Sequence, residues 1–277
     1  MNWHEIVPEL DPLDPFGRTP IGLRFGVLGD PVEHSLSPRM QEAAFDALGI
    51  PAEYLAISVN EVEFDPCLTN LEMCGFAGVN ITVPHKQHPT LLALGDAVVK
   101  QTGAANTVRF TNEGTQVINT DPPGFYAPIQ TLPHGRALVL GAGGAAAAAI
   151  FALREKGWDV AVWNRTSSKA QSLAARWMCE HRDEPDPAGC SLVVNATSLG
   201  LHQGEEPPLE WRRLEAGTTI YDLAYRQGPT DFLSHALLEG VRTVDGREML
   251  VAQGAVSFSW WTRRNPPVEV MRKAVGL

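Results

Sequence analysis

Hydrophobic positions along the chain follow two spacings in turn, which predicts a succession of strands and helices. Short apolar runs that are typical of buried strands occur at residues 24–29, 54–59 and 78–84. The segments between and after them are predicted to be helical, at residues 38–48, 61–74 and 84–94. This alternation predicts an α/β domain with a mainly parallel sheet.

A hairpin is predicted at the end of this first domain. Residues 106–110 and 115–119 have the composition of strands, and the Asn112, Glu113 and Gly114 between them have that of a hairpin turn. We expect the first domain to end near Asp121.

A second strand–helix series begins at the segment LVLGAGGAA, residues 138–146. A short apolar strand leads directly into Gly141, Gly143 and Gly144, and an alanine-rich helix follows. Glycines so placed allow a tight turn and a close approach of the backbone to a pyrophosphate, while Ala146 lets helix and strand pack. The helix N-terminus adds free N–H groups and a positive dipole end. The segment therefore predicts the phosphate-binding turn of a Rossmann-type nucleotide fold.

The uncharged run at residues 137–153 could instead be taken for a membrane span. It falls short of the roughly 20 strongly apolar residues that a span requires, and it consists largely of Ala and Gly between Arg136 and Arg154. We therefore predict no membrane segment.

The remaining elements complete a second α/β domain. Further strands are predicted at residues 158–163, at 220–225, ending near Tyr225, and at 241–246. Another strand is predicted to begin at residue 192 and to end at the loop that carries Asn195. A helix is predicted at 230–238, and a helical run begins at 246. The predicted organisation is an N-terminal extension (1–22), a substrate-binding and catalytic domain (23–121 plus 253–277) and a nucleotide-binding domain (122–252). Residues 257–277 are expected to pack back on the first domain.

Composition narrows the class of protein. The 277 residues carry a formal net charge of −10 and a sequence pI near 5.3, which argues against nucleic acid or an anionic membrane surface as a partner. The four cysteines form no CxxC pair and lack the His spacing of a zinc site, so no metal is expected. No signal-peptide pattern opens the chain, and a cytoplasmic location is expected.

The loop HSLSP, residues 34–38, places two hydroxyls at the start of a predicted helix. Ser37 is a favourable N-cap residue and Pro38 a favourable first helical residue. The hydroxyls of Ser35 and Ser37 would then gather at the positive helix end, which suits a carboxylate. A capped helix without any ligand would explain the same residues.

Polar residues also stand where other elements end. Thr82 and Lys86 follow the strand at 78–84, and open α/β sheets bind ligands at the carboxyl ends of their strands. Asn106 and Asp121 likewise lie at element ends. The alternatives are a solvated surface charge for Lys86 and Asx-turns for Asn106 and Asp121.

The strand at 158–163 is followed by Asn164, Arg165 and Thr166, with Lys169 three residues further on. An NAD-binding unit has an acidic residue at this place, about 20 residues past the glycines, to accept the ribose hydroxyls. Arg165, Thr166 and Lys169 instead offer a guanidinium, a hydroxyl and an ammonium, which suit a 2′-phosphate. NADP is therefore the predicted cofactor.

Nine segments, taken in order, resemble those of the shikimate dehydrogenase family (shikimate/quinate dehydrogenases). They are HSLSP, GVNITVPHK, GAANT, NTDPPG, GAGGAA, NRT, NATSLG, YDLAY and DGREMLVAQG, and they extend over nearly all of residues 24–277. The resemblance implies two α/β domains, the second of Rossmann type, with a C-terminal helix that returns to the first. It also implies reversible reduction of 3-dehydroshikimate to shikimate by NADPH, a step of aromatic amino acid (chorismate) biosynthesis.

The resemblance further implies roles for individual residues. Lys86 and Asp121 would form the catalytic pair. The substrate would be held by Ser35, Ser37, Thr82, Asn106, Asp121, Tyr225 and Gln253. The cofactor would be held by Gly141, Ala142, Gly143, Gly144, Ala145, Asn164, Arg165, Thr166, Lys169, Leu223 and Gly246.

The chain departs from the family pattern at three places. Gln41 and Glu42 replace a His and an Asn after HSLSP. Gln227 replaces a proline after the tyrosine of YDLAY, and Arg263 replaces a glycine near the C-terminus. We expect these changes to affect local packing more than chemistry.

Three alternative functions stay open. A quinate or dual-specificity dehydrogenase would keep nearly every motif and accept one more ring hydroxyl, although the two serines of HSLSP favour shikimate. A non-catalytic NADPH-binding regulator is disfavoured by Lys86 and Asp121. A folate-linked dehydrogenase of similar build is disfavoured because the motifs extend through both domains. A monomer or a homodimer is expected.

Overall fold

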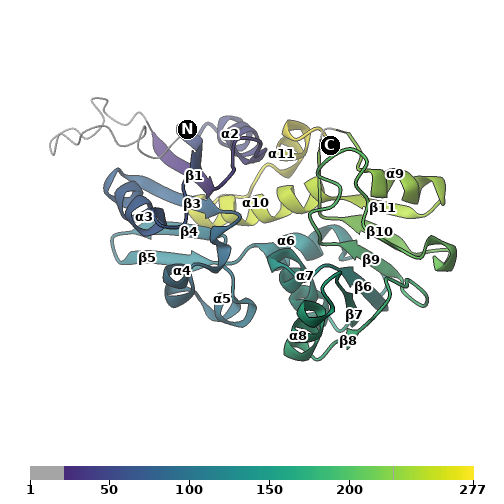
Figure 1. Ribbon diagram of the computed structural model, residues 1–277. Helices are drawn as coiled ribbons and strands as arrows, with labels where there is room; N and C mark the ends of the chain where they lie inside the picture. Colours follow the sequence, from purple (N-terminus) through teal and green to yellow (C-terminus); the bar gives the residue numbers. More distant parts are fainter. Residues whose placement is uncertain (1–21, 227) are drawn as a thin grey trace. The chain divides into compact units, whose positions relative to one another are not determined.

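The structure is a computed structural model that describes residues 22–226 and 228–277. It divides into two compact units: unit 1 comprises the described residues up to Thr120 together with Gln253–Leu277, and unit 2 comprises Asp121–Ala252. Each unit contains one sheet with helices packed against it (Figure 1). The predicted N-terminal extension, except Gly22, and the departure at Gln227 lie outside the described residues.

The sheet of unit 1 has the strand order β2-β1-β3-β4-β5. The strands are β1 (Leu23–Gly29), β2 (Ala52–Ser58), β3 (Phe76–Ile81), β4 (Thr107–Thr111) and β5 (Gly114–Ile118). β2, β1 and β3 run parallel, whereas β4 and β5 add the predicted antiparallel hairpin. The sheet is therefore mixed, with a parallel part built from the strand–helix series and an antiparallel edge.

The helices of unit 1 differ from the prediction at one place that matters for the site. They are α2 (Ser37–Ala47), α3 (Phe64–Met73), the 3-10 turn η1 (His85–Gln87), α4 (Pro89–Leu94), α5 (Ala97–Thr102) and α11 (Val268–Ala274). The single helix predicted at 84–94 is wrong, because His88 is extended, with φ −60° and ψ 134°. Proline disfavours the α conformation for the residue before it, and His88 precedes Pro89. Lys86 therefore lies on a short turn of its own.

Alternate side chains of this sheet form two apolar layers. One face, which includes Leu28 and Ile57, packs in a single cluster with side chains of α3, α4 and α5. On the other face Phe25 stacks on Phe45 of α2 and contacts Trp261 of helix α10 (Gly246–Thr262), with ring centroids 5.1 and 4.8 Å away. These aromatic contacts fix the C-terminal half of α10 against the sheet.

Unit 2 contains a parallel sheet with the order β11-β10-β9-β6-β7-β8. The strands are β6 (Arg136–Leu140), β7 (Asp159–Trp163), β8 (Glu180–His181), β9 (Leu192–Asn195), β10 (Thr219–Asp222) and β11 (Arg242–Asp245). Later strands continue on opposite sides of the β6–β9 pair, so the strand order reverses there, which is where such sheets bind ligands. β10 ends at Asp222 and not near Tyr225 as predicted.

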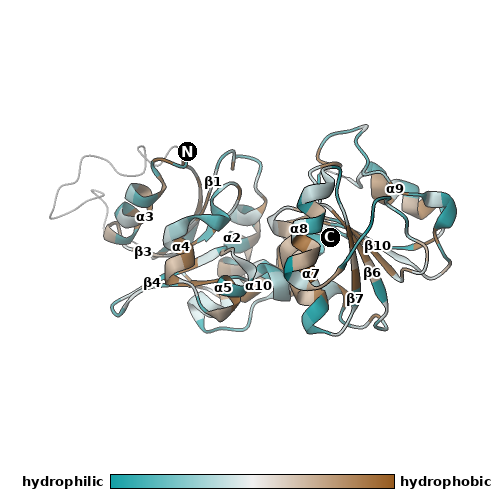
Figure 2. Cartoon of the chain, turned by 60° about the horizontal axis from the view of Figure 1, so that its bottom comes forward, coloured by the Kyte–Doolittle hydropathy of each residue, from teal (hydrophilic) through white to brown (hydrophobic). Residues whose placement is uncertain are grey.

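The helices of unit 2 cover both faces of its apolar sheet (Figure 2). They are α6 (Asp121–Tyr126), the 3-10 turn η2 (Ala127–Ile129), α7 (Gly144–Glu155), α8 (Ser167–Trp177), the 3-10 turn η3 (Trp211–Arg213), α9 (Asp231–Leu238) and the first part of α10. The alanine-rich segment considered above as a span is β6 and α7, and its small side chains pack in the core of the unit. Within the described part of the chain, no helix is both long and apolar enough to cross a membrane.

Candidate active site

The serines of HSLSP lie at the start of α2, but their hydrogen bonding differs from the prediction. α2 begins at Ser37, and Leu36 stands at the N-cap position with helical angles, φ −81° and ψ −6°. The Ser35 hydroxyl accepts the backbone N–H of Ser37 at 3.2 Å. Ser37 is therefore already inside the helix, and the predicted N-cap bond from its hydroxyl is wrong.

This arrangement leaves both hydroxyls able to bind a ligand. Among the described residues, neither serine hydroxyl donates a hydrogen bond to protein. They stand beside the first turn of an eleven-residue helix, whose N–H groups carry partial positive charge. The loop thus retains donors suited to a carboxylate, without the capping role that would explain them otherwise.

Lys86 is held by its neighbours on the η1 turn. The His85 ring contacts the carbonyl oxygen of Val59 through Nε2 at 2.7 Å and packs on Phe64, with centroids 4.7 Å apart. Since a carbonyl only accepts, Nε2 must carry the hydrogen. The carbonyl of Lys86 accepts the N–H of Ala105 at 2.7 Å. The backbone of Lys86 is thus tied on both sides, while its side chain is half-buried.

Thr82 lies at the same end of β3. Its N–H donates to the carbonyl of Leu28 at 2.8 Å, and its own carbonyl accepts the N–H of His85 at 3.0 Å. A Cβ added to Gly29 would overlap the Thr82 methyl, so the β1 backbone approaches this side chain closely. Thr82 and Lys86 therefore share one rigid turn after β3, as their spacing predicted.

Asn106 and Gln253 meet through Thr120. The Asn106 amide donates to the Thr120 hydroxyl at 3.0 Å, and its carbonyl oxygen accepts the Thr120 N–H at 2.7 Å. The Thr120 hydroxyl also lies 3.4 Å from Oε1 of Gln253. Asn106 is buried and Gln253 half-buried. Two residues 147 positions apart are thus linked by one hydroxyl, which sequence reasoning did not single out.

Behind these residues lies a buried polar network that was also missed. The Asn80 amide donates to the hydroxyls of Thr107 and Ser257, each at 3.0 Å, and its carbonyl oxygen accepts the Tyr54 hydroxyl at 2.7 Å. The Ser257 hydroxyl donates to the backbone carbonyl of Gln253 at 3.1 Å. Asn80 and Thr120 stand inside two of the motifs quoted above, GVNITVPHK and NTDPPG, which is the only sequence signal for them.

Asp121 directly follows Thr120 and is the first residue of α6 in unit 2. Its side chain is buried, with 5% of its surface exposed. A buried carboxylate is costly unless it is paired or hydrogen-bonded, and Asp121 does not stand without an interacting partner. The pairing of Asp121 with Lys86 stays a prediction.

The glycines of the turn in unit 2 are of two kinds. Gly141 is required by the backbone, whereas Gly143 and Gly144 border open space. Gly141 has φ +117°, and a Cβ there would lie 2.7 Å from the carbonyl oxygen of Ala196. A Cβ at Gly143 or Gly144 would have no atom within 4 Å. Gly143 is the N-cap of α7, without a side-chain cap. Open space and the N–H groups of a first helical turn without a side-chain cap are therefore found together at this helix end, as phosphate binding requires.

The predicted 2′-phosphate residues follow β7. Arg165, Thr166 and Lys169 are exposed, whereas Asn164 is half-buried and donates from its amide to the carbonyl of Thr166 at 3.0 Å. Across residues 22–226 and 228–277, neither Arg165 nor Lys169 forms an ion pair. Both cations are thus available to an anion.

Three residues proposed for the ligand sites lie after β10. Leu223 and Tyr225 are half-buried, and burial raises the pKa of the Tyr225 phenol. A Cβ at Gly246 would lie 2.6 Å from the carbonyl oxygen of Leu223, so a close backbone contact alone explains that glycine.

A buried network at the ends of β9 and β10 shapes the loops nearby. The Asp222 carboxylate accepts hydrogen bonds from the Asn195 amide at 2.7 Å, the Thr230 hydroxyl at 2.5 Å and the Ala224 N–H at 3.0 Å. Burial raises the pKa of Asp222 to about 6, although these hydrogen bonds act in the opposite direction. Asp222 stands inside YDLAY, yet sequence reasoning gave it no role.

Comparison with known proteins places the chain in a family. Its sequence matches the models described as shikimate dehydrogenase substrate binding domain (residues 27–108), shikimate / quinate 5-dehydrogenase (127–184) and shikimate 5′-dehydrogenase C-terminal domain (246–275). A shikimate dehydrogenase (NADP(+)) from Natronomonas pharaonis is 36% identical over 266 residues, covering 91% of this chain and 97% of the relative. One from Jannaschia sp. is 40% identical and covers 90% and 96%.

The chain belongs to the shikimate dehydrogenase family. The resemblance inferred from nine sequence segments is thus confirmed. Among solved structures, shikimate 5-dehydrogenase from Thermus thermophilus, in complex with NADP(H) and shikimate, has a TM-score of 0.84 and 38% identity. That comparison covers 91% of this chain and 98% of the other. The two-unit α/β architecture is that of shikimate dehydrogenases.

Replacing two glycines of the turn is expected to affect stability differently. Gly141→Ala forces a Cβ against Ala196 at a φ that alanine rarely adopts, so the free energy of unfolding should fall by about 2 to 4 kcal/mol. Gly144→Ala adds a methyl in open space at a helix start and should leave stability unchanged or raise it by up to about 1 kcal/mol. Urea unfolding of both variants checks this, and equal losses would contradict it.

Asp222 is expected to make stability fall as pH rises. Its folded pKa of about 6 lies above the ordinary 3.8, so between these values the folded chain holds a proton that the unfolded chain has released. The free energy of unfolding should therefore decrease from about pH 4 to pH 6, by at most about 3 kcal/mol from this group.

The measurement compares the melting temperatures of wild type and Asp222→Asn at pH 4.5 and 7.5. The variant should gain several degrees relative to wild type at the higher pH. Asp46→Asn, at an exposed position of α2, is the matched control and should show no such trend. A difference between wild type and Asp222→Asn that does not vary with pH would refute the assignment.

Proposed function

We propose that this chain catalyses the reversible NADP-dependent reduction of 3-dehydroshikimate to shikimate, a step of aromatic amino acid (chorismate) biosynthesis. The observation that carries the proposal is that relatives named shikimate dehydrogenase (NADP(+)) match over nine-tenths of both chains at 36 to 40% identity. The site geometry supports it, because the residues that the chemistry needs lie on fixed turns at strand ends.

Substrate binding is assigned to polar residues of unit 1 together with Asp121 and Tyr225. The hydroxyls of Ser35 and Ser37 at the start of α2, which donate to no described residue, would hold the substrate carboxylate. The ring hydroxyls would be bound by Thr82, Asn106, Asp121, Tyr225 and Gln253. The Thr120 bridge between Asn106 and Gln253 supports this assignment, since it holds the two amides in one fixed arrangement.

Cofactor binding is assigned to the glycine turn and the loop after β7. The N–H groups of Gly143, Gly144 and Ala145 would bind the pyrophosphate, in the space that the absent side chains leave. Arg165, Thr166 and Lys169, beside Asn164, would bind the 2′-phosphate. Gly141, Ala142, Leu223 and Gly246 would shape the backbone around the cofactor.

The main task of the protein in the proposed reaction is to place a positive charge beside the substrate carbonyl. Bound NADPH would supply the hydride for the carbonyl carbon of the substrate. Negative charge then develops on the carbonyl oxygen, and Lys86 would meet it with its ammonium group and donate the proton. In the oxidative direction a neutral Lys86 would accept the proton of the alcohol. Asp121 would orient the ammonium and bind a substrate hydroxyl.

A simple assay distinguishes the proposed function from that of a quinate or dual-specificity dehydrogenase. Purified full-length protein should reduce NADP⁺ with shikimate, and kcat/KM for shikimate should exceed that for quinate. Equal or greater kcat/KM with quinate would move the chain to that branch of the family. No turnover with either substrate would leave only a binding or regulatory role.

Lys86→Ala is expected to affect the chemical step more than binding, because the charge that Lys86 meets exists fully only as hydride moves. The kcat should fall by about 10² to 10⁴, with much smaller changes in the dissociation constants of NADPH and shikimate. Steady-state kinetics and fluorescence titrations measure the two effects separately. A variant that keeps its kcat and loses only affinity would show that Lys86 merely holds the substrate.

Asp121→Asn should behave differently from Lys86→Ala in the same assays. If Asp121 orients Lys86 and binds substrate, the variant should lose kcat and raise KM together. The double variant should be little worse than Lys86→Ala alone, because the two residues act as one unit. Additive losses in the double variant would separate them.

Replacing Arg165 and Lys169 together with Ala should raise KM for NADP⁺ tenfold or more and leave the use of NAD⁺ nearly unchanged. Each charge-assisted bond to the 2′-phosphate contributes about 1.5 to 3 kcal/mol, while neither side chain has an ion-pair partner among the described residues to lose. Melting temperatures should match wild type. An unchanged preference for NADP⁺ would remove both residues from the site.

A further inference from the structure

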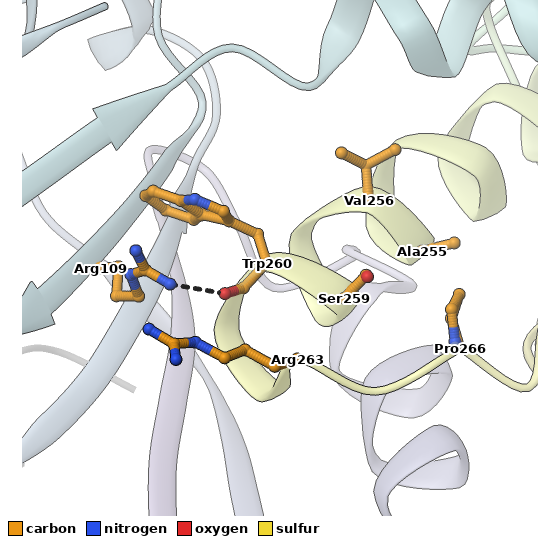
Figure 3. Close-up of a pocket in the computed structure, with 7 residues that line it drawn as sticks. All are labelled: Arg109, Ala255, Val256, Ser259, Trp260, Arg263 and Pro266. Carbon is orange, nitrogen blue, oxygen red and sulfur yellow. Dashed lines mark hydrogen bonds between the residues drawn. The ribbon is translucent and has the colours of Figure 1, made fainter.

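An open pocket of about 650 Å³ lies in unit 1 beside the C-terminal half of α10 (Figure 3). Its wall is formed by Val256, Ser259 and Trp260 of that helix, by Arg109 of β4 and by Arg263 just after the helix, with Ala255 and Pro266 completing it. The volume is within the range of small-molecule sites. No residue assigned above to substrate or cofactor lines it.

Two guanidinium groups of this pocket lack a compensating charge. Arg109 donates to neutral acceptors, the carbonyl of Trp260 at 2.8 Å and Oε1 of Gln116 at 2.5 Å, and its Nε is buried without an acceptor. Among the described residues neither Arg109 nor Arg263 forms an ion pair. In a chain of net charge −10, two guanidinium groups at one pocket without a carboxylate partner among the described residues favour an anionic ligand.

The backbone at Arg263 strengthens this argument. Arg263 is one of two residues other than glycine with a left-handed backbone in the described part of the chain, with φ +56°. Such a conformation costs about 1 kcal/mol relative to glycine. The position thus favours glycine conformationally, and what arginine adds is a guanidinium at the pocket.

The rest of the lining indicates what carries the anion. The indole of Trp260 lies under the Arg109 guanidinium, 4.4 Å from its carbon to the ring centroid, and Val256, Ala255 and Pro266 are apolar. The Ser259 hydroxyl adds one polar group. Figure 3 shows both guanidinium groups on the same side of the pocket, away from Pro266 and Ala255. The surface is therefore charged at one end and apolar at the other.

We propose that this pocket binds a compact organic anion, whose carboxylate or phosphate contacts Arg109 and Arg263 while a planar or apolar body packs on Trp260 and Val256. The site differs from that of the proposed substrate. Gln253 lies on the same helix but contacts Thr120, whereas the pocket is lined by α10 residues from Ala255 onward and by none of the residues assigned to the substrate.

The test uses the full-length protein and the indole N–H signals of its seven tryptophans in a ¹⁵N–¹H spectrum. Trp260→Phe identifies the signal of Trp260. Benzoate and phenyl phosphate are then titrated in low-salt buffer free of other multivalent anions, with benzyl alcohol as the uncharged comparison. We expect a saturable shift of the Trp260 signal with the anions and at least tenfold weaker binding of the alcohol. The tighter of the two anions identifies the preferred head group.

Arg263→Gly is the decisive variant, because glycine suits the backbone and removes only the side chain. It should melt at or above the wild-type temperature and bind both anions at least tenfold more weakly. Arg264→Ala removes the neighbouring charge, which does not line the pocket, and should bind as wild type does. Unchanged affinity in Arg263→Gly, equal binding of benzyl alcohol, or the absence of any saturable shift at Trp260 would overturn the proposal.

Discussion

The carboxamide of Asn106 is the interaction on which the candidate substrate site depends most. Its amide and carbonyl both bond Thr120, while its backbone pairs with Ile81 and Ile118 on two different strands. One buried residue therefore holds the end of β3 and the end of β5 through its backbone, and the residue that precedes Asp121 through its side chain. Leaving either group of such an amide unpaired costs about 1 to 3 kcal/mol, so the geometry is well determined. The side chain of Gln253 is linked to the same network through the Thr120 hydroxyl.

Local rules predicted much of this molecule and failed at identifiable places. The strand–helix order, the hairpin and the glycine turn follow from periodicity and turn composition, which act over a few residues. The helix predicted around Lys86 was wrong because Pro89 disfavours the helical conformation for His88. The prediction gave more weight to the apolar periodicity than to this local effect. The N-cap at Ser37 was wrong because the helix begins one residue earlier than expected: Leu36 stands at the N-cap position, and Ser37 already lies inside the helix.

The buried networks lie beyond sequence reasoning for a different reason. Asn80 bonds Ser257, 177 positions away, and Asp222 bonds Asn195 across two strands. Nothing in the local pattern distinguishes these residues from turn formers or surface polar groups. Only the motifs containing Asn80, Thr120 and Asp222 gave any signal, and that signal came from resemblance. Conversely, the contact of Gly246 with Leu223 shows that a residue in a family motif can be explained by packing alone.

Arg165 and Lys169 differ from the proposed substrate residues in how much the folded structure depends on them. They are exposed and have no ion-pair partner among the described residues, whereas the buried Asn106 bonds Thr120 through both its amide and its carbonyl group. In the proposed assignment, natural variation could therefore reach a new coenzyme preference through neutral intermediates, because each change on that loop leaves the scaffold intact. Substitutions at the amides proposed to bind the substrate would instead first reduce the stability of the fold. With the residue roles proposed above, coenzyme choice would be the more evolvable trait of this architecture, and substrate choice the more constrained one.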